Sequence, residues 1–358
     1  MAEFDFDHLA RANTDAALCR ASIRQQPAHF RVDEELPFEL AGEGGHTFLL
    51  IEKTGSNTDW LAGQLARFAG VEPVAVGYAG LKDRHAVTTQ WFSIKLEGHD
   101  EPDWNQFEAD NCRILKRCKH TKKLKRGVLS GNQFSLLLTD IKGDSARWQQ
   151  NLERIKACGV PNYFAQQRFG YNLNNLQRAQ QWFEQALKPK KSQQRKMILS
   201  AGRSWLFNLV LSERIKQNNW QQWLAGDMMQ LDGSGSVFLP DSNDDRVEKR
   251  LNDFDIHPTG PMWGRGRPVS QDLTLALEQQ VLADWQDWRQ GLEQAGLKQE
   301  RRSLRLMPQQ LSWQWQGEDL LLSFFLPPGS YATAVLREVA DITDVSQRNS
   351  EKPDVSQL

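Results

Sequence analysis

Short runs of alternating apolar and polar residues dominate the chain from Phe30 to about Ile141. Runs of this kind, separated by clusters of Gly, Asn and Asp, are typical of strands. They predict strands over residues 29–36, 46–55, 74–80, 88–96 and 133–141. Between the second and third runs the apolar residues recur at helical spacing. This predicts a helix over residues 58–70, with Asn57 or Thr58 as its N-cap and Gly70 as its stop.

Beyond about Cys158 the apolar spacing changes to a longer, helical period. It predicts helices over residues 176–187, 200–217 and 273–294. Strand patterns return over residues 311–316 and 319–327, and a further helix follows a cap at Ser330. A strand-rich start and end around a helix-rich middle indicate one discontinuous domain interrupted by an insertion.

The composition is that of an ordinary globular protein. Of 358 residues, 39% are hydrophobic and 25% are charged, and the length favours two domains over one. The four cysteines are too few and too irregularly placed for a disulfide framework, which favours a reduced, cytoplasmic compartment. We expect no secretory signal at the N-terminus and no membrane span, since no apolar run approaches the roughly 18 residues that a span requires.

The net charge of −1 conceals an uneven distribution. No acidic residue occurs between Asp110 and Asp140, whereas eight basic residues do. Without those eight, the chain has 36 basic and 45 acidic residues, a net charge of −9. A cluster of this density is typical of phosphate-backbone binding, although a solvated hairpin without a ligand would show the same pattern. Besides Arg113, its members are Lys116, Arg117, Lys119, Lys122, Lys123, Lys125 and Arg126.

A second candidate for chemistry is Asp83, which lies between two predicted strands in the segment GLKDRHAVTTQ, residues 80–90. It is flanked by Lys82 and Arg84, and neighbouring cations favour the ionised carboxylate that a nucleophile or base requires. Taken alone, an aspartate among basic residues is more often simply part of a turn. The chain offers no convincing metal site, because Cys112, Cys118 and His120 lack the short cysteine spacing of zinc sites and a fourth ligand.

The segment at residues 80–90 resembles the signature of the tRNA pseudouridine synthase D (TruD) family, Gly-x-Lys-Asp-x-x-Ala-x-Thr-x-Gln. Four further segments resemble that family in the same order along the chain. They are SGNQF at residues 130–134, GVPNYFAQQRFG at 159–170, SAGRSWLFN at 200–208 and LPPGSYATAVLRE at 326–338. Five ordered motifs over most of the chain are far more specific than any one alone.

The resemblance implies a role for individual residues. Asp83 takes the place of the family's catalytic aspartate, and Asn132 and Phe134 fall near the target nucleotide. Phe30 falls where the family has an aromatic residue against the substrate. Tyr331 stands where members often have Phe, and it keeps a ring face for stacking on the base. A basic residue should pair with Asp83, and the sequence leaves open whether this is Arg24 or Lys82.

The resemblance also implies the fold and the reaction. The expected fold is α+β, with a mixed, mostly antiparallel sheet in a catalytic domain at residues 1–156 and 307–345 and an α/β domain inserted at 157–306. Residues 346–358 are expected to form a mobile tail. Isomerisation of uridine, implied to occur at position 13 of tRNA, needs no redox step and therefore no cofactor. We expect no obligate protein partner and a monomer. The alternatives are a pseudouridine synthase for another RNA and a non-catalytic RNA-binding protein.

Overall fold

The computed structural model describes residues 4–96, 98, 100–241 and 244–346, and the tail expected after Ser346 lies outside them. The chain divides into two compact units. One contains Ala17–Trp148, Pro308–Gly329 and the segment from Ala340 onward, and we call it the sheet unit. The other, the helical unit, contains the chain up to Ala16 together with Gln149–Met307 and Ser330–Val339. The domain bounds expected from the sequence stay a prediction, since compactness does not show independent folding.

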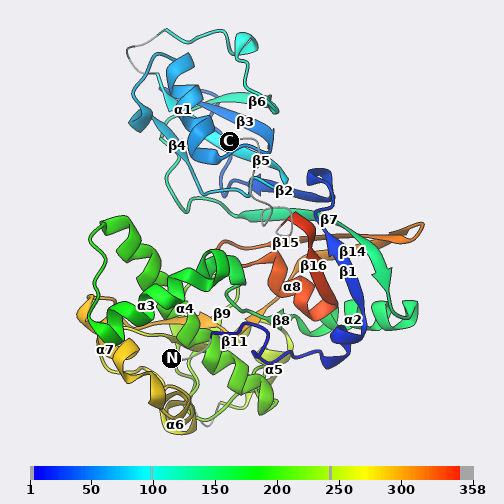
Figure 1. Cartoon of the computed structure of the whole chain (residues 1–358), viewed down its shortest axis with the longest axis vertical. Helices are drawn as coiled ribbons and strands as arrows, with labels where there is room; N and C mark the ends of the chain where they lie inside the picture. The colour runs from blue at the N-terminus through cyan, green and yellow to red at the C-terminus, as the bar shows by residue number, and fades with distance from the viewer. Residues whose placement is uncertain (1–3, 97, 99, 242–243, 347–358) are drawn as a thin grey trace, which may run out of the picture. The chain divides into compact units, whose positions relative to one another are not determined.

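A ten-stranded sheet forms the sheet unit (Figure 1). Seven strands follow one another in the order β14-β15-β7-β2-β5-β3-β6, while β1 pairs with β7 and β16, and β4 pairs with β5. The bounds are β1 Arg20–Ile23, β2 Phe30–Glu35, β3 His46–Thr54, β4 Val76–Tyr78, β5 Val87–Lys95, β6 Cys112–His120, β7 Gly131–Lys142, β14 Gln309–Gln316, β15 Asp319–Leu326 and β16 Asp341–Asp344.

The sheet is mixed and mostly antiparallel, which confirms the expected fold class. Its parallel pairs are β2 with β5 and β1 with β16. The long strand β7 lies between β15 and β2, which pair with opposite edges of its first part, and β1 pairs with its last residues. These partners come from both ends of the chain, so β7 brings segments together that are far apart in sequence.

Helix α1 (Thr58–Phe68) packs its apolar side on one face of this sheet. Leu61 and Leu65 are fully buried against Leu49, Ile51 and Phe92 of β3 and β5. The helix occurs where the spacing predicts it, and its position fixes the segment that follows it. Burial of each such leucine contributes roughly 1.5–3 kcal/mol relative to exposure.

The helical unit contains its own four-stranded sheet in the order β10-β9-β11-β12. The apolar pattern did not predict these strands, although the family resemblance implied an α/β domain in this region. Helix α4 packs on β11 and on α3, and α3 also contacts α7 (Figure 1). The helix expected over residues 273–294 is two helices joined by a short 3₁₀ turn at Ala283–Trp285. The bounds are α2 Ser145–Cys158, α3 Asn174–Gln185, α4 Ser192–Lys216, α5 Arg246–Asn252, α6 Asp272–Val281, α7 Gln286–Gln294, α8 Ala332–Val339, β8 Val160–Pro161, β9 Met229–Leu231, β10 Val237–Phe238, β11 Ile256–Met262, β12 Glu300–Ser303 and β13 Arg305–Leu306.

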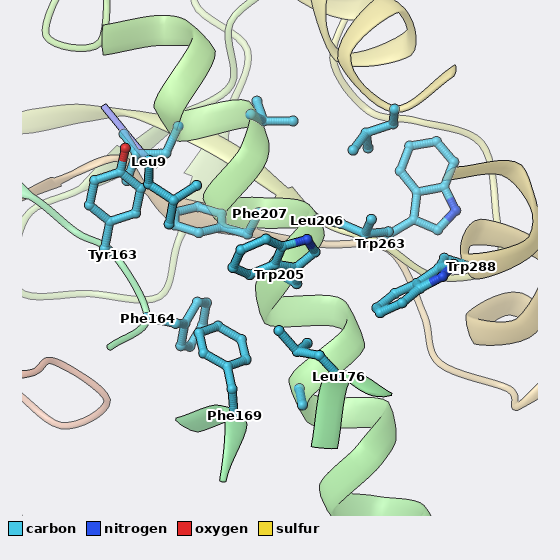
Figure 2. Close-up of a cluster of buried hydrophobic side chains, with 14 of the residues drawn as sticks. Leu9, Tyr163, Phe164, Phe169, Leu176, Trp205, Leu206, Phe207, Trp263 and Trp288 are labelled. Atoms are coloured by element: carbon cyan, nitrogen blue, oxygen red, sulfur yellow. The ribbon is translucent and has the colours of Figure 1, made fainter. Parts of the chain in front are cut away.

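Aromatic side chains fill the core of the helical unit, as Figure 2 shows. Trp205 of α4 meets Phe169 edge-on at 5.6 Å between ring centroids, and Trp288 of α7 is 1% exposed. The chain has 13 tryptophans, and packing of this kind accounts for several of them, because large rings join several helices with few side chains. No helix among the described residues is long and apolar enough to cross a membrane.

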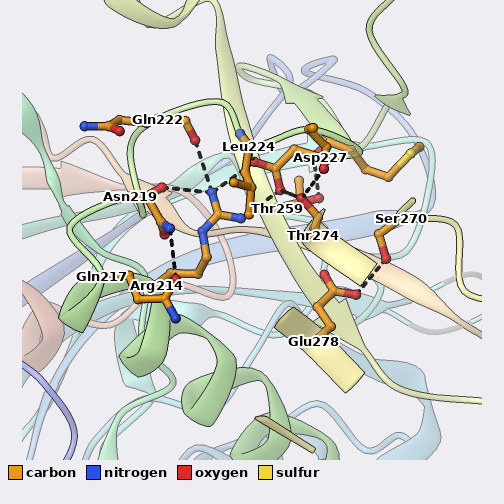
Figure 3. Close-up of polar contacts among 12 residues, drawn as sticks. Arg214, Gln217, Asn219, Gln222, Leu224, Asp227, Thr259, Ser270, Thr274 and Glu278 are labelled. Carbon is orange, nitrogen blue, oxygen red and sulfur yellow. Dashed lines mark hydrogen bonds and ion pairs between the residues drawn. The ribbon is translucent and has the colours of Figure 1, made fainter. Parts of the chain in front are cut away.

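A buried ion pair closes the loop after α4 (Figure 3). Arg214 and Asp227 are almost fully buried and form two parallel hydrogen bonds of 2.8 and 2.9 Å. The Asp227 carboxylate also accepts from the Leu224 N–H and the Thr274 hydroxyl. Bonds of this kind offset the cost of burying the two charges, although Arg214 Nε is buried without a hydrogen-bond partner among the described residues.

We predict that Arg214→Leu lowers the free energy of unfolding by about 3–5 kcal/mol, because it leaves the Asp227 carboxylate buried without its counter-ion. Urea denaturation of this variant and of Arg214→Leu/Asp227→Leu measures the effect. The double variant should recover part of the loss, since it removes both charges. Equal stability of Arg214→Leu and the unchanged protein would contradict the prediction.

Candidate active site

Asp83 lies in the turn between β4 and β5 of the sheet unit. Its Oδ1 accepts the His85 backbone N–H at 2.9 Å, the usual bond of an aspartate turn. Its Oδ2 accepts from Arg24 Nη2, also at 2.9 Å. The side chain is 34% exposed, so the carboxylate is held on two sides and open to a ligand on the rest.

The Arg24 guanidinium is buried and bridges two carboxylates. Its Nη2 contacts Asp83, and its Nη1 donates to Asp344 at the end of β16. The guanidinium also lies over the Phe30 ring, 3.8 Å from the centroid. Arg24 has a left-handed backbone, with φ of 58°, which costs roughly 1–2 kcal/mol for a residue other than glycine. The ion pairs offset this strain and fix the direction of the Asp83 side chain. Of the two candidate partners, Arg24 is the one in contact with Asp83.

Lys82 makes different contacts. Its ammonium lies 2.6 Å from the Glu34 carboxylate and donates to Asn132 Oδ1 at 2.8 Å. Glu34 is fully buried on β2 and also accepts the Trp91 N–H. Because Lys82 occupies the amide oxygen of Asn132, the amide nitrogen of Asn132 is left as a donor, and it has no acceptor among the described residues.

The backbone of the turn is anchored to α1 and β5. The Lys82 N–H donates to the Thr58 hydroxyl at 3.1 Å, and that hydroxyl donates to Gln90 Oε1 at 3.0 Å. The Gln90 amide in turn donates to the Gly80 carbonyl at 2.5 Å. The Thr58 side chain therefore serves the turn and does not cap its own helix.

Three aromatic rings support the site from the sheet. Phe30 and Phe134 meet edge-on at 6.3 Å, and Phe134 stacks on Phe324 at 5.5 Å. Phe30 is 3% exposed and Phe134 is 8% exposed. In this arrangement Phe30 carries the Arg24 guanidinium, and a contact of either ring with the substrate stays a prediction.

Tyr331 belongs to the helical unit, where it precedes α8. Its ring meets Phe164 edge-on at 6.1 Å and is partly exposed. The Arg302 guanidinium lies 4.1 Å from the Phe164 centroid and donates to Asn162 Oδ1 at 2.6 Å. Burial lowers the pKa of Arg302 to about 10, against a weaker opposing effect of Tyr331. The Tyr331 ring thus packs against Phe164, which Arg302 holds in place, and part of the Tyr331 ring is exposed.

The basic cluster of the sequence forms edge strand β6 and the loop after it. Some of its members are engaged within the protein. Lys119 pairs with Glu101, and Lys123 donates to the Val74 carbonyl. Arg126 lies over the Tyr78 ring at 3.7 Å.

The side chains of the remaining predicted phosphate-binding residues are exposed and form no hydrogen bond or ion pair with any residue that the structure describes. These residues are Lys116, Arg117, Lys122 and Lys125. The structure thus separates cations that hold the fold together from cations that are available to a ligand.

A sequence model described as tRNA pseudouridine synthase D (TruD) matches residues 12–174 and 171–339, which is most of the chain. The chain belongs to this family. The resemblance read from the five motifs is therefore confirmed, and with it membership of a family of isomerases that convert uridine to pseudouridine.

Relatives of this TruD family member agree over nearly their whole length. The tRNA pseudouridine synthase D of Nitrosococcus oceani is 50% identical over 328 residues, which cover 91% of this chain and 92% of the relative. That of Methylococcus capsulatus is 45% identical and covers 94% and 95%. A crystal structure of a protein assigned as TruD from Methanosarcina mazei shares the fold, with a TM-score of 0.70, 19% identity and coverage of 92% and 95%.

Sequence reasoning missed Glu34, Asp344 and Lys53. Glu34 and Lys53 had a visible signal, because each continues the inward-facing, apolar alternation of its strand. Asp344 had none, since its contact depends on the pairing of β1 with β16. No group of three or more His, Cys, Asp or Glu residues within the described ranges could hold a metal ion.

Lys53 is a buried cation on β3, 1% exposed, whose ammonium donates to the Ser56 carbonyl at 2.7 Å. Burial lowers the pKa of Lys53, while Cys112 and Asp83 oppose the shift. The folded state therefore releases this proton at a lower pH than the unfolded chain does. Between the folded-state and unfolded-state pKa values of Lys53, the unfolded chain binds more protons than the folded state. The free energy of unfolding therefore rises with pH in that range.

We predict that the difference in free energy of unfolding between the unchanged protein and Lys53→Met shifts in favour of the unchanged protein as the pH increases toward the unfolded-state pKa of 10.5. Below the folded-state pKa the difference between the two should be constant. Urea denaturation between pH 7 and about pH 10 measures this. Both proteins should carry Cys112→Ser, so that no thiol titrates beside residue 53. Parallel curves over the whole range would show that the fold does not shift this lysine.

Proposed function

We propose that Asp83 is the catalytic carboxylate with which this TruD family member converts uridine to pseudouridine in tRNA. The observation that carries the proposal is the contrast in burial around it. Arg24, Lys82 and Glu34 are 6%, 7% and 0% exposed, and Asp83 is the member of this charged group that a ligand can reach. A carboxylate aimed by buried partners is already in the geometry that a reaction needs.

The chemistry requires that the bond from the sugar to N1 of the base breaks and that a bond from the sugar to C5 forms. Asp83 can act covalently at the sugar, or it can remove a proton from the sugar. Both routes need the carboxylate in one fixed direction, and Arg24 supplies this. When the new bond is complete, C5 loses its proton and N1 takes one up, so the product is an isomer of the substrate and the reaction consumes no redox equivalent and needs no cofactor.

The base must leave its stack before it can turn within the site. The amide nitrogen of Asn132, left free by Lys82, suits a carbonyl oxygen of uracil. The partly exposed ring of Tyr331 suits the face of the base. We assign Asn132 to the edge of the uracil, and a stacking role for Tyr331 rests on the family resemblance alone. Phe30 and Phe134 support the site from below.

The exposed cations Lys116, Arg117, Lys122 and Lys125 suit the phosphates of the same RNA, and Lys119, Lys123 and Arg126 hold the surface that displays them. The family resemblance points to uridine 13 of tRNA as the target, and a substrate of this kind places the protein in the cytoplasm. We infer that it acts as a monomer. A tRNA carrying cytidine at position 13 should lose the modification if this target is correct.

Two alternative functions predict different results. A synthase for another RNA would leave unmodified tRNA unchanged and would modify a different fraction of total RNA. A non-catalytic RNA-binding protein would show salt-dependent binding and no product, and it would have no use for the Arg24–Asp83 pair.

Asp83→Asn should abolish the release of tritium from tRNA that is labelled at C5 of uridine. The amide cannot replace the carboxylate as nucleophile or base, whereas tRNA binding should change by less than about twofold, because phosphate contacts dominate affinity. The exposed residue Glu72 provides the control variant, Glu72→Gln, which should release tritium at the normal rate. Full activity of Asp83→Asn would refute the assignment.

Arg24→Lys should lower kcat roughly 10- to 100-fold with little change in KM, because an ammonium cannot span Asp83 and Asp344 together and the carboxylate loses its fixed direction. Arg20→Lys is the matched control, since Arg20 begins the strand that Arg24 directly follows, is 73% exposed and approaches Asp341 only at 3.9 Å. Steady-state tritium release measures both variants. An unchanged kcat in Arg24→Lys would show that the bridge does not position Asp83.

A further inference from the structure

A groove of about 410 Å³ lies at the end of β6 in the sheet unit. The proposed chemistry at Asp83 does not use it. Its lining combines apolar and basic side chains, among them Phe38, His120, Lys122, Leu124, Lys125 and Val128.

One wall of the groove is the loop after β6, and this loop is pinned to the sheet. The buried Leu124 donates its N–H to Ser93 Oγ at 2.9 Å, and the Gly127 N–H donates to the Ala79 carbonyl at 2.7 Å. The loop lies so close to Gly77 that a Cβ there would be 2.3 Å from the Leu124 carbonyl oxygen. The wall is therefore preformed, which reduces the entropy cost of binding.

The opposite wall is a stacked pair of rings. Phe38 and His120 lie nearly parallel, with centroids 4.9 Å apart. The Ala41 N–H donates to His120 Nδ1, so the neutral ring carries its proton on Nε2 and keeps a donor there. Gly44, with φ of 115°, allows the chain to pass within reach of the His120 carbonyl. Both sides of the groove are thus held by specific contacts.

The two cations at the groove that remain available are Lys122 and Lys125. Both are exposed, and neither ammonium group has a hydrogen-bond or ion-pair partner within the described part of the chain. Lys123, between them, is held by the Val74 carbonyl. The Gly127 bond to Ala79 also ties this loop to the segment that leads into Asp83.

We propose that the groove binds one unstacked nucleotide of the RNA substrate, separate from the uridine that reacts. The base lies against Phe38 and Val128, and Lys122 and Lys125 hold the adjoining phosphates. An unstacked nucleotide presents an apolar ring face and an anion within one residue, and the groove offers the complement of both. An acidic peptide would satisfy the lysines and leave the apolar wall without a partner. The proposal rests on the proposed function, since it takes RNA as the ligand.

The first test compares two ways of disabling the groove. Val128→Trp fills it without removing a charge, and Lys122→Gln/Lys125→Gln removes its charges without filling it. Each should raise the KM for unmodified tRNA about tenfold, within the range for loss of one stacked base, and should leave kcat within about twofold. Combining them should add little, because both abolish the same contact.

Lys116→Gln/Arg117→Gln is the matched control, because it also removes two exposed charges, on β6 and outside the groove. Its effect should add fully to that of Val128→Trp. If Val128→Trp leaves KM unchanged, or if its effect adds fully to that of the lysine variant, the groove does not bind a nucleotide.

The second test locates the nucleotide. Thr121→p-benzoylphenylalanine places a photoreactive group on the groove lining, and cross-links to the tRNA should map to one nucleotide other than the modified uridine. Cross-links spread over many nucleotides, or none, would overturn the proposal. Failure of the proposed function is distinguishable from failure of the groove proposal, because the unchanged protein would then make no pseudouridine. In that case filter binding of tRNA to the unchanged protein and to Val128→Trp still tests the groove.

Discussion

The bridge from Arg24 to Asp83 and Asp344 is the interaction on which the active-site geometry depends. It joins residues from the start, the first third and the end of the chain. Parallel pairing of β1 with β16 sets Ile23 opposite Asp344, so the residue after Ile23 meets that carboxylate directly. The strained backbone of Arg24 and the Phe30 ring beneath its guanidinium serve the same contact. An exposed carboxylate keeps one direction only if something buried holds it, and here a buried guanidinium does so.

In the sheet unit some charged side chains are buried and hold the structure together, whereas others are exposed and available to a ligand. The Lys82–Glu34 pair is buried and orients Asn132, whereas Asp83 remains open. The basic cluster shows the same division, with some cations bonded to their neighbours and others exposed. The net charge of −1 therefore says little about ligands. The feature relevant to RNA binding is that the exposed cations, whose side chains have no partner among the described residues, lie on a preformed surface of the unit that carries Asp83.

Much of this fold could be predicted from the sequence, for physical reasons that differ between elements. Strands β2, β3 and β7 and helix α1 follow their apolar periodicity, because each buries one side. Strand β5 is buried on both faces. Strand β6 was not predicted, since it is an edge strand built largely from basic residues and gives little apolar signal. Family motifs made Asp83 and Asn132 candidates for the site, but only the tertiary structure shows that Arg24 contacts Asp83 and that Lys82 does not. Such a choice depends on strand pairing between distant segments, which local sequence does not encode.

The most direct test of the account is to map pseudouridine by nucleotide position in an unmodified tRNA after incubation with the protein and with its Asp83→Asn variant. The account predicts one new pseudouridine, at position 13, with the unchanged protein and none with the variant. A pseudouridine formed equally by both proteins, or none formed by either, would contradict it.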